Sequence, residues 1–133
     1  MIYDRLEEAP LPFGALAGLD LGTVTLGVAV SDGLRHVATP LETIKRKKFT
    51  LDANRLLDIC TARHIVGLVL GLPLNMDGTE GPRAQSTRAF ARNLSQKTSL
   101  PIIYWDERLS TVAAERALLE ADMTRKRRGE VID

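Results

Sequence analysis

The sequence predicts an α/β domain with a five-stranded mixed sheet, helices on both faces, and the element order βββαβαβα. Three short apolar segments near the N-terminus are separated by tight links, which favours an antiparallel meander. Farther along, apolar runs alternate with segments of helical period, and strand–helix–strand units require parallel pairing through crossovers. With 133 residues, the chain is long enough to bury one hydrophobic core, and residues 14–133 are expected to form a single domain.

The first half of the chain predicts the meander. Residues 1–13 contain several acids and two prolines and are expected to form a flexible leader. Residues 15–21 and 26–31 are predicted to form the first two strands, joined by a tight turn over 22–25. The segment 37–44 is predicted to form the third strand.

The second half alternates between helix and strand. Apolar residues recur at helical spacing over 51–64, which predicts a helix. The continuous apolar run over 65–71 is typical of a strand covered on both faces. The remaining expected elements are a glycine-rich loop over 72–81, a helix over 82–97 that opens on Pro82, a strand over 101–105 and a helix over 111–122.

Composition excludes several protein classes. Hydrophobic residues make up 44% of the chain and charged residues 26%, which is ordinary for a soluble globular protein. No apolar run approaches the roughly 18 residues that a membrane span requires, so no membrane partner is expected. The N-terminus has no apolar signal-peptide core, and the single cysteine, Cys60, excludes an internal disulfide. The expected location is the cytoplasm.

Carboxylates stand at the ends of two predicted strands. Asp20 interrupts an otherwise apolar run, and Asp106 and Glu107 follow the strand over 101–105. If these strands are parallel and adjacent, their carboxyl ends meet at one edge of the sheet, where α/β folds bind ligands. Side chains alternate along a strand, so Asp20 shares its face with Gly18 and Gly22, which leaves room for a ligand. A strand-end aspartate that caps a turn or pairs with a lysine is the alternative.

Converging carboxylates favour a hard divalent cation. Mg²⁺ prefers oxygen ligands, and two such ions about 4 Å apart can activate water and stabilise the leaving oxygen in phosphodiester hydrolysis. Neither histidine, His36 or His64, lies at a metal-ligand spacing from another candidate ligand, so zinc is not supported. A Ser-His-Asp triad is not supported either.

Three motifs resemble the YqgF family, also called RuvX. They are G-L-D-L-G-T-V-T-L-G-V-A-V-S-D, G-L-P-L-N-M-D-G-T-E-G-P-R-A-Q and D-E-R-L-S-T, and the resemblance covers residues 16–133. It implies an RNase H-like fold and a metal-dependent nuclease, a hydrolase of two-metal-ion type that matures the 5′ end of pre-16S rRNA during ribosome biogenesis. A Holliday-junction resolvase acting on branched DNA is the alternative within the family.

The resemblance also implies a ligand set. Asp20 matches the acid of the first strand, Glu107 the acid of the D-E-R motif, and Asp133 the acid that opens the final helix; together they would be the catalytic residues and would hold Mg²⁺ or Mn²⁺. The sequence stops at Asp133, so the final helix of the family is expected to be absent here. For that reason crystals are expected to show an empty or singly occupied metal site, and the natural protein is expected to extend further.

Candidate substrate-binding residues flank these acids. Thr23 lies in the turn after Asp20, Asn75 in the glycine-rich loop, and Arg83 in the first turn of a predicted helix, where backbone N–H groups favour anions. Arg108 is a candidate for neutralising the scissile phosphate, and an ion pair with Asp106 is the alternative. Tyr104 and Trp105 could stack on bases, although aromatic residues in strands more often belong to the core.

Two basic blocks hold 8 of the 18 lysines and arginines. A charge run alone is typical of a solvated surface. Beside a nuclease site, the second block is expected to contact phosphates; its members are Arg125, Lys126, Arg127 and Arg128. The first block, Lys45–Lys48, is the weaker candidate, because a position on the far side of the sheet is compatible with the sequence.

The expected partner is nucleic acid, either an rRNA precursor or branched DNA. A non-catalytic nucleic-acid-binding module with the same fold is a further alternative. The stretch Asp-Leu-Gly-Thr also resembles the phosphate loop of actin-like ATPases, but that fold needs two such domains. No dimer interface is readable, so a monomer or a weak homodimer is expected; junction cleavage on two symmetric strands would require the dimer.

Overall fold

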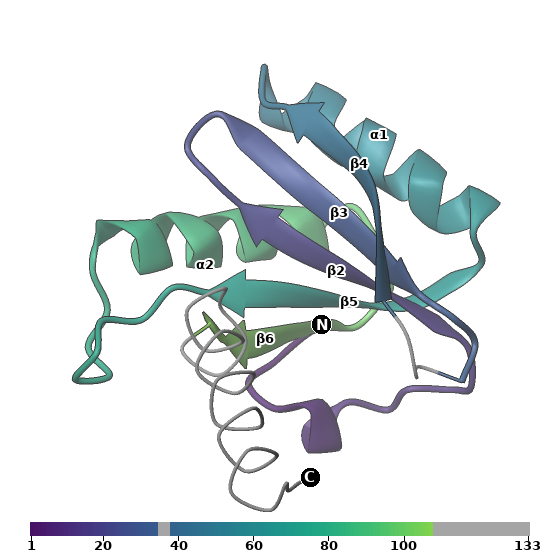
Figure 1. Ribbon diagram of the computed structural model, residues 1–133, viewed down its shortest axis with the longest axis horizontal. Helices are drawn as coiled ribbons and strands as arrows, with labels where there is room; N and C mark the ends of the chain where they lie inside the picture. The colour runs from purple at the N-terminus through teal and green to yellow at the C-terminus, as the bar shows by residue number, and fades with distance from the viewer. Residues whose placement is uncertain (35–37, 108–133) are drawn as a thin grey trace, which may run out of the picture.

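The computed structural model describes residues 1–34 and 38–107, and a six-stranded mixed sheet forms its centre (Figure 1). The strand order across the sheet is β1-β6-β5-β2-β3-β4. The strands are β1 (Ile2–Tyr3), β2 (Ala15–Leu21), β3 (Thr25–Ser31), β4 (Ala38–Lys45), β5 (Ile65–Leu72) and β6 (Ile102–Asp106). The helices are a short 3-10 turn, η1 (Leu6–Glu8), and two α-helices, α1 (Phe49–Ala62) and α2 (Pro82–Ser95).

The sheet combines a meander with parallel crossovers, as predicted. β2, β3 and β4 pair antiparallel, whereas β5 pairs parallel with β2 and with β6. Helix α1 makes the crossover from the meander to β5, and α2 makes the crossover from β5 to β6. As a result, β2, β5 and β6 are neighbours and all end at the same edge of the sheet, where their arrowheads point in Figure 1.

The sixth strand corrects the expected count of five. Ile2 and Tyr3 pair parallel with Ile102 and Ile103 of β6, so part of the segment expected to be a flexible leader is an edge strand. Leu11 also packs on the sheet, because a Cβ placed on Gly67 would lie 2.5 Å from its Cδ2. A two-residue strand carries too little alternation to be recognised from the sequence alone.

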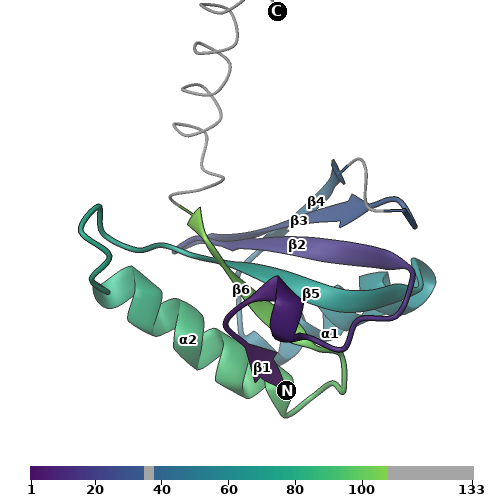
Figure 2. The same ribbon diagram turned by 90° about the horizontal axis from the view of Figure 1, so that it is seen from below.

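Both described α-helices cover the same face of the sheet (Figure 2). They contact each other through the rings of Phe49 and Phe90, whose centroids are 5.5 Å apart in an edge-to-face arrangement. The helix predicted over 111–122 lies outside the described residues. Neither described helix is long and apolar enough to cross a membrane.

The hydrophobic core lies between this sheet face and the two helices. Strand residues that point toward the helices are almost fully buried, because alternate positions of β2 and β5 carry the apolar side chains. The fully buried side chains of largest volume include Leu26, Leu56, Leu68, Leu70, Leu94 and Ile102. The opposite face carries glycines and polar residues at the carboxyl ends of the strands, and the candidate site lies there.

Candidate active site at the carboxyl edge of the parallel strands

Asp20 stands on the face of the sheet that α1 and α2 do not cover. Its neighbours along β2, Leu19 and Leu21, are buried on the helix side, whereas Asp20 is exposed. Across the sheet it pairs with Gly27 of β3, and a Cβ on that glycine would be only 3.6 Å from the Asp20 Cβ. The register that pairs Leu19 with Leu70 places Gly71 of β5 beside Asp20 on the other side.

Glu107 reaches the same place from the end of β6. Trp105 pairs with Gly71, and Glu107 follows two residues later along the chain. A Cβ on Gly71 would lie 2.7 Å from the Glu107 Oε1, so the carboxylate occupies the space above this glycine. Asp20 and Glu107 are therefore brought together across β5, as the sequence predicted, and it is the lack of a side chain at residue 71 that permits it.

The electrostatics of Glu107 fit a cation site. Partial burial raises the pKa of Glu107, and the Asp20 charge raises it further, while nearby Arg83 lowers it. Two adjacent carboxylates with no nitrogen or sulfur ligand between them form a donor set suited to Mg²⁺ or Mn²⁺. In residues 1–34 and 38–107 no three metal-ligating side chains come together, and the expected third ligand, Asp133, lies outside that part of the chain.

Arg83 is a basic residue that lies close to the pair formed by Asp20 and Glu107. Pro82 occupies the first turn of α2, and the next side chain, Arg83, turns back to the end of β2, where its Nη2 donates to the Leu21 carbonyl at 3.2 Å. Its charge acts on the Glu107 carboxyl. The sequence prediction of Arg83 near the acids is therefore consistent with its position.

A cavity of about 960 Å³ extends over this face of the sheet. Its lining includes Asp20, Glu107 and Arg83, together with residues that the sequence did not single out, namely Gly27, Thr43 and Gly71. Trp105 also lines it and is 37% exposed, whereas Tyr104 on the opposite face is buried beneath the Arg88 guanidinium, 4.8 Å from the ring centroid. Because side chains alternate along β6, the sequence shows that Tyr104 and Trp105 lie on opposite faces of the sheet. It does not show which of the two faces is buried.

Thr23 and Asn75 lie at the same edge without lining the cavity. Thr23 is exposed in the turn between β2 and β3. The Asn75 amide donates to the Thr79 hydroxyl at 2.9 Å, and Asp77 accepts from the Thr79 backbone N–H at 3.0 Å. The side chain of Asn75 therefore contributes to the hydrogen bonding of its own loop, and its phosphate contact stays a prediction.

Six other predicted residues fall outside the described residues. They are the phosphate-contact candidates and the third acid: Arg108, Arg125, Lys126, Arg127, Arg128 and Asp133.

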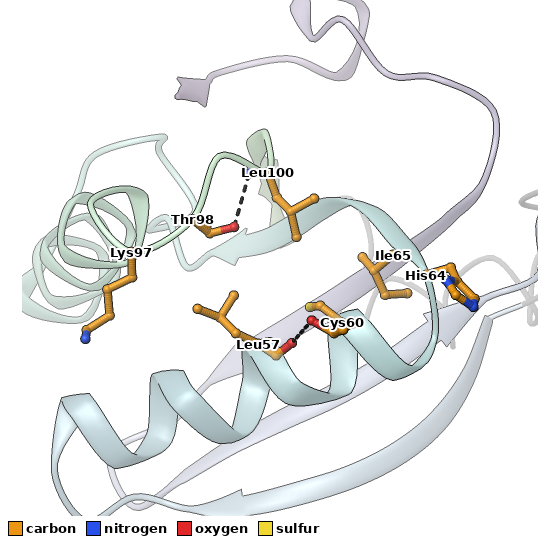
Figure 3. A pocket seen from close by; sticks show the side chains of 8 residues that line it. Leu57, Cys60, His64, Ile65, Lys97, Thr98 and Leu100 are labelled. Carbon is orange, nitrogen blue, oxygen red and sulfur yellow. Dashed lines mark hydrogen bonds between the residues drawn. The ribbon is translucent and has the colours of Figure 1, made fainter.

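A second cavity, of about 420 Å³, lies at the amino end of β5, where α1 ends (Figure 3). Cys60 and Leu57 of α1 line it on one side, and Lys97 and Leu100 on the other. No carboxylate lines it. Burial raises the pKa of the Cys60 thiol to about 11, so the thiol is protonated at neutral pH and is a poor nucleophile. This cavity therefore has no acid pair comparable to Asp20 and Glu107.

The chain is similar to one protein family and to several named proteins. The model of the family described as "RuvX: Holliday junction resolvase" matches residues 14–133. A protein of Paracoccus denitrificans is 75% identical over the whole chain and 86% of its own length, and one of Cereibacter sphaeroides is 71% identical over the whole chain and 85% of its length. Both carry the name "Putative pre-16S rRNA nuclease".

Solved structures support the fold. Thermus thermophilus RuvC in complex with a Holliday junction substrate aligns with a TM-score of 0.54 at 15% identity, over 80% of this chain and 75% of that one. A second structure of the same RuvC gives 0.53. At this level of identity the likeness shows an RNase H-like architecture.

Proposed function

The chain belongs to the RuvX family, and from this premise we propose that it is a nuclease that hydrolyses phosphodiester bonds in the 5′-end maturation of pre-16S rRNA. The names of its relatives, which are 70–75% identical, support this substrate. The proposal includes a divalent metal, Mg²⁺ or Mn²⁺, and a two-metal-ion mechanism. It also places the protein in the cytoplasm, where ribosomal precursors are processed in bacteria.

The observation that carries the proposal is the juxtaposition of Asp20 and Glu107 across Gly71. Each carboxylate belongs to or directly follows a strand of the central sheet, and rigid elements hold site geometry better than loops do. A binding module would gain nothing from two acids on the surface that faces a polyanion, because like charges repel. A hydrolase that holds cations there does gain from them.

In this proposal some of the described residues bind the cation and others position the substrate. Asp20 and Glu107 would hold the cation, which when bound supplies Lewis-acid activation of water and neutralises developing charge. Arg83, fixed by its bond to the Leu21 carbonyl, would neutralise a non-bridging oxygen of the scissile phosphate. Gly27, the neighbour of Asp20 on β3, has no side chain and so leaves the substrate backbone room to approach Asp20, whereas the space above Gly71 is taken by Glu107 itself.

The test is a cleavage assay on two substrates, a precursor fragment containing the 5′ junction of 16S rRNA and a synthetic four-way DNA junction. Each is offered with Mg²⁺, with Mn²⁺ and with EDTA. Asp20→Asn and Glu107→Gln should each abolish metal-dependent cleavage while the circular dichroism spectrum stays unchanged. Asp58→Asn, on the exposed surface of α1, is the matched control and should cleave like the wild type. Cleavage that survives Asp20→Asn contradicts the proposed site.

Resolution of Holliday junctions is the second candidate, because the family description names that activity. It predicts preferential cleavage of the four-way junction and a dimer in solution, which light scattering would detect. A protein that binds both substrates and cleaves neither would instead be the non-catalytic module.

The residues beyond 107 complete the proposal. Asp133 would provide the third carboxylate, Arg108 a phosphate contact, and Arg125, Lys126, Arg127 and Arg128 a phosphate-binding segment. Asp133→Asn should weaken metal-dependent cleavage, and glutamine at residues 125–128 should reduce the salt dependence of binding to any nucleic acid sequence.

A further inference from the structure

The first basic block, Lys45–Lys48, lies at the same edge of the sheet as the acids. β4 runs antiparallel to β3, which runs antiparallel to β2, so the end of β4 returns to the edge where β2 ends. Lys45 pairs with Thr25, the first residue of β3. The arrowhead of β4 accordingly points to the same edge as that of β2 (Figure 1). The end of β4 that carries Lys45 therefore lies at the edge of the acids, and residues 46–48 lead on from it to α1, which begins at Phe49.

One lysine of the block also shares the face of Asp20. Asp20 pairs with Gly27, and Gly27 pairs with Thr43, so these three residues form one row across the sheet. Residues in one row point to the same face, and Lys45 follows Thr43 at the next position on that face. With strands about 4.8 Å apart and a rise of about 3.3 Å per residue, the Cα atoms of Asp20 and Lys45 are roughly 12 Å apart.

The block is fixed to the strand that carries Asp20. The Arg46 side chain donates to the Gly22 carbonyl at 2.5 Å, and the Arg46 backbone N–H donates to the Val24 carbonyl at 2.9 Å. At its other end, the Lys47 backbone N–H donates to the Asp52 carboxylate at 3.2 Å. The position of the block relative to Asp20 is therefore set by the sheet and by these bonds.

Three side chains of the block remain available to a ligand. Lys45, Lys47 and Lys48 are exposed. The two side-chain ion pairs within residues 1–34 and 38–107, Arg55–Glu42 and Arg88–Glu80, include none of them. Arg46 differs, because its Nη1 donates to the Gly22 carbonyl, which makes it the side chain that fixes the block.

We propose that Lys45, Lys47 and Lys48 bind the sugar–phosphate backbone of the nucleic-acid substrate, on the meander side of the acid pair. The proposal rests on the proposed function. A distance of roughly 12 Å corresponds to on the order of three nucleotides of a stacked strand, at about 3.4 Å for each step. Lys45 thus holds the substrate strand a few nucleotides from the bond that is cleaved, and Lys47 and Lys48 follow it along the same segment.

The test measures binding of a fluorescein-labelled single-stranded RNA oligonucleotide across a salt series. All proteins carry Asp20→Asn, so that the probe stays intact. Lys45→Gln, Lys47→Gln and Lys48→Gln are combined in one variant. The matched control removes three exposed positive charges near the opposite edge, by Arg63→Gln at the end of α1, Arg92→Gln in the last turn of α2, and Lys97→Gln just beyond it.

The lysine variant should bind more weakly at low salt, and the slope of log K against log salt should flatten by about 2, since each phosphate contact in a single strand contributes about 0.7. The control variant should keep the parental slope within experimental error. Equal slopes in all three proteins, or equal flattening in both variants, overturn this inference alone. A wild-type chain that neither binds nor cleaves either substrate overturns the proposed function together with it.

Discussion

The carboxylate of Glu107 occupies the space that a side chain at residue 71 would need. A Cβ on Gly71 would stand 2.7 Å from Oε1 of Glu107, closer than non-bonded atoms approach, and 3.0 Å from its Cγ, which is a tight contact. This glycine lies on β5, between the strands that carry the two acids. The acid pair therefore depends on a residue that has no functional group.

Gly71→Ala should reduce metal-dependent cleavage about 10²-fold, because displacing a reacting or metal-holding group by about 1 Å costs that much. The fold should persist, since Glu107 is at the surface and can turn away. Gly33→Ala adds the same methyl group where no other atom lies within 4 Å, and it should leave cleavage unchanged. Rates and thermal melts of the two variants decide this, and a Gly71→Ala protein with full activity would contradict the packing argument.

Glu107→Gln should stabilise the metal-free protein at neutral pH. The pKa of Glu107 is raised above its ordinary value of 4.5 by burial and by Asp20, so the folded state holds a proton that the unfolded state releases. Wild-type stability therefore falls as the pH rises from about 4.5 through the folded pKa, and the variant avoids this loss. The expected gain is about 0.5 kcal/mol above that window, the scale of a partly exposed charge pair, and none below it.

Urea titrations in EDTA at several pH values would measure this difference. Glu42→Gln is the control of opposite sign, because the Arg55 hydrogen bond lowers the pKa of Glu42. That variant should lose stability above pH 4.5 and lose none at lower pH. A Glu107→Gln protein less stable than wild type at neutral pH would show that the carboxylate is held by favourable contacts.

Arg83→Gln should lower the cleavage rate about 10²-fold, the usual cost of removing one charge-stabilising donor. It should also move the acid limb of the pH–rate profile to higher pH. The reason is that the Arg83 charge lowers the pKa of Glu107, and only the ionised carboxylate can hold a cation. Arg92→Gln, in the last turn of the same helix, should change neither quantity. A rate loss without a shift of the acid limb would mean that Arg83 acts on the substrate alone.

Cys60 should react slowly with iodoacetamide in the folded protein. The side chain is 3% exposed and burial raises its pKa to about 11, so almost no thiolate is present at pH 8. Because the chain has one cysteine, the mass after labelling reports on this residue directly. Labelling should accelerate strongly in denaturant. Cys60→Ala should cost about 1 kcal/mol of stability and leave cleavage intact, whereas equally fast labelling with and without denaturant would contradict its burial.

The order of the elements from β2 to β6 could be predicted from local sequence patterns, and the meeting of Asp20 with Glu107 from the topology that this order implies. The apolar alternation of β2 and the helical period of α1 are local signals. Parallel strands joined by crossovers end at a common edge, so two strand-end acids were expected to converge. The third acid and the second basic block, Asp133 and residues 125–128, stay predictions.

Other features needed the folded chain. The phosphate contact of Asn75 stays a prediction, and only the structure shows that its amide also donates to Thr79 within the loop. Ile2 and Tyr3 were placed in the leader, but they pair with β6. In each case the position of a short segment depends on a hydrogen-bonding partner, and the periodicity of apolar residues does not identify that partner.

The sequence by itself determined the strands β2 to β6, the helices α1 and α2, and that Asp20 points away from the buried face, because these follow from alternation and period within a few residues. Only the tertiary structure decided the row in which Asp20 lies between Gly27 and Gly71, the position of Glu107 above Gly71, and the return of Lys45 to the same edge. The physical reason is register. Lateral neighbours are set by hydrogen bonding between strands distant in the chain, and a shift of one residue would turn every side chain to the other face.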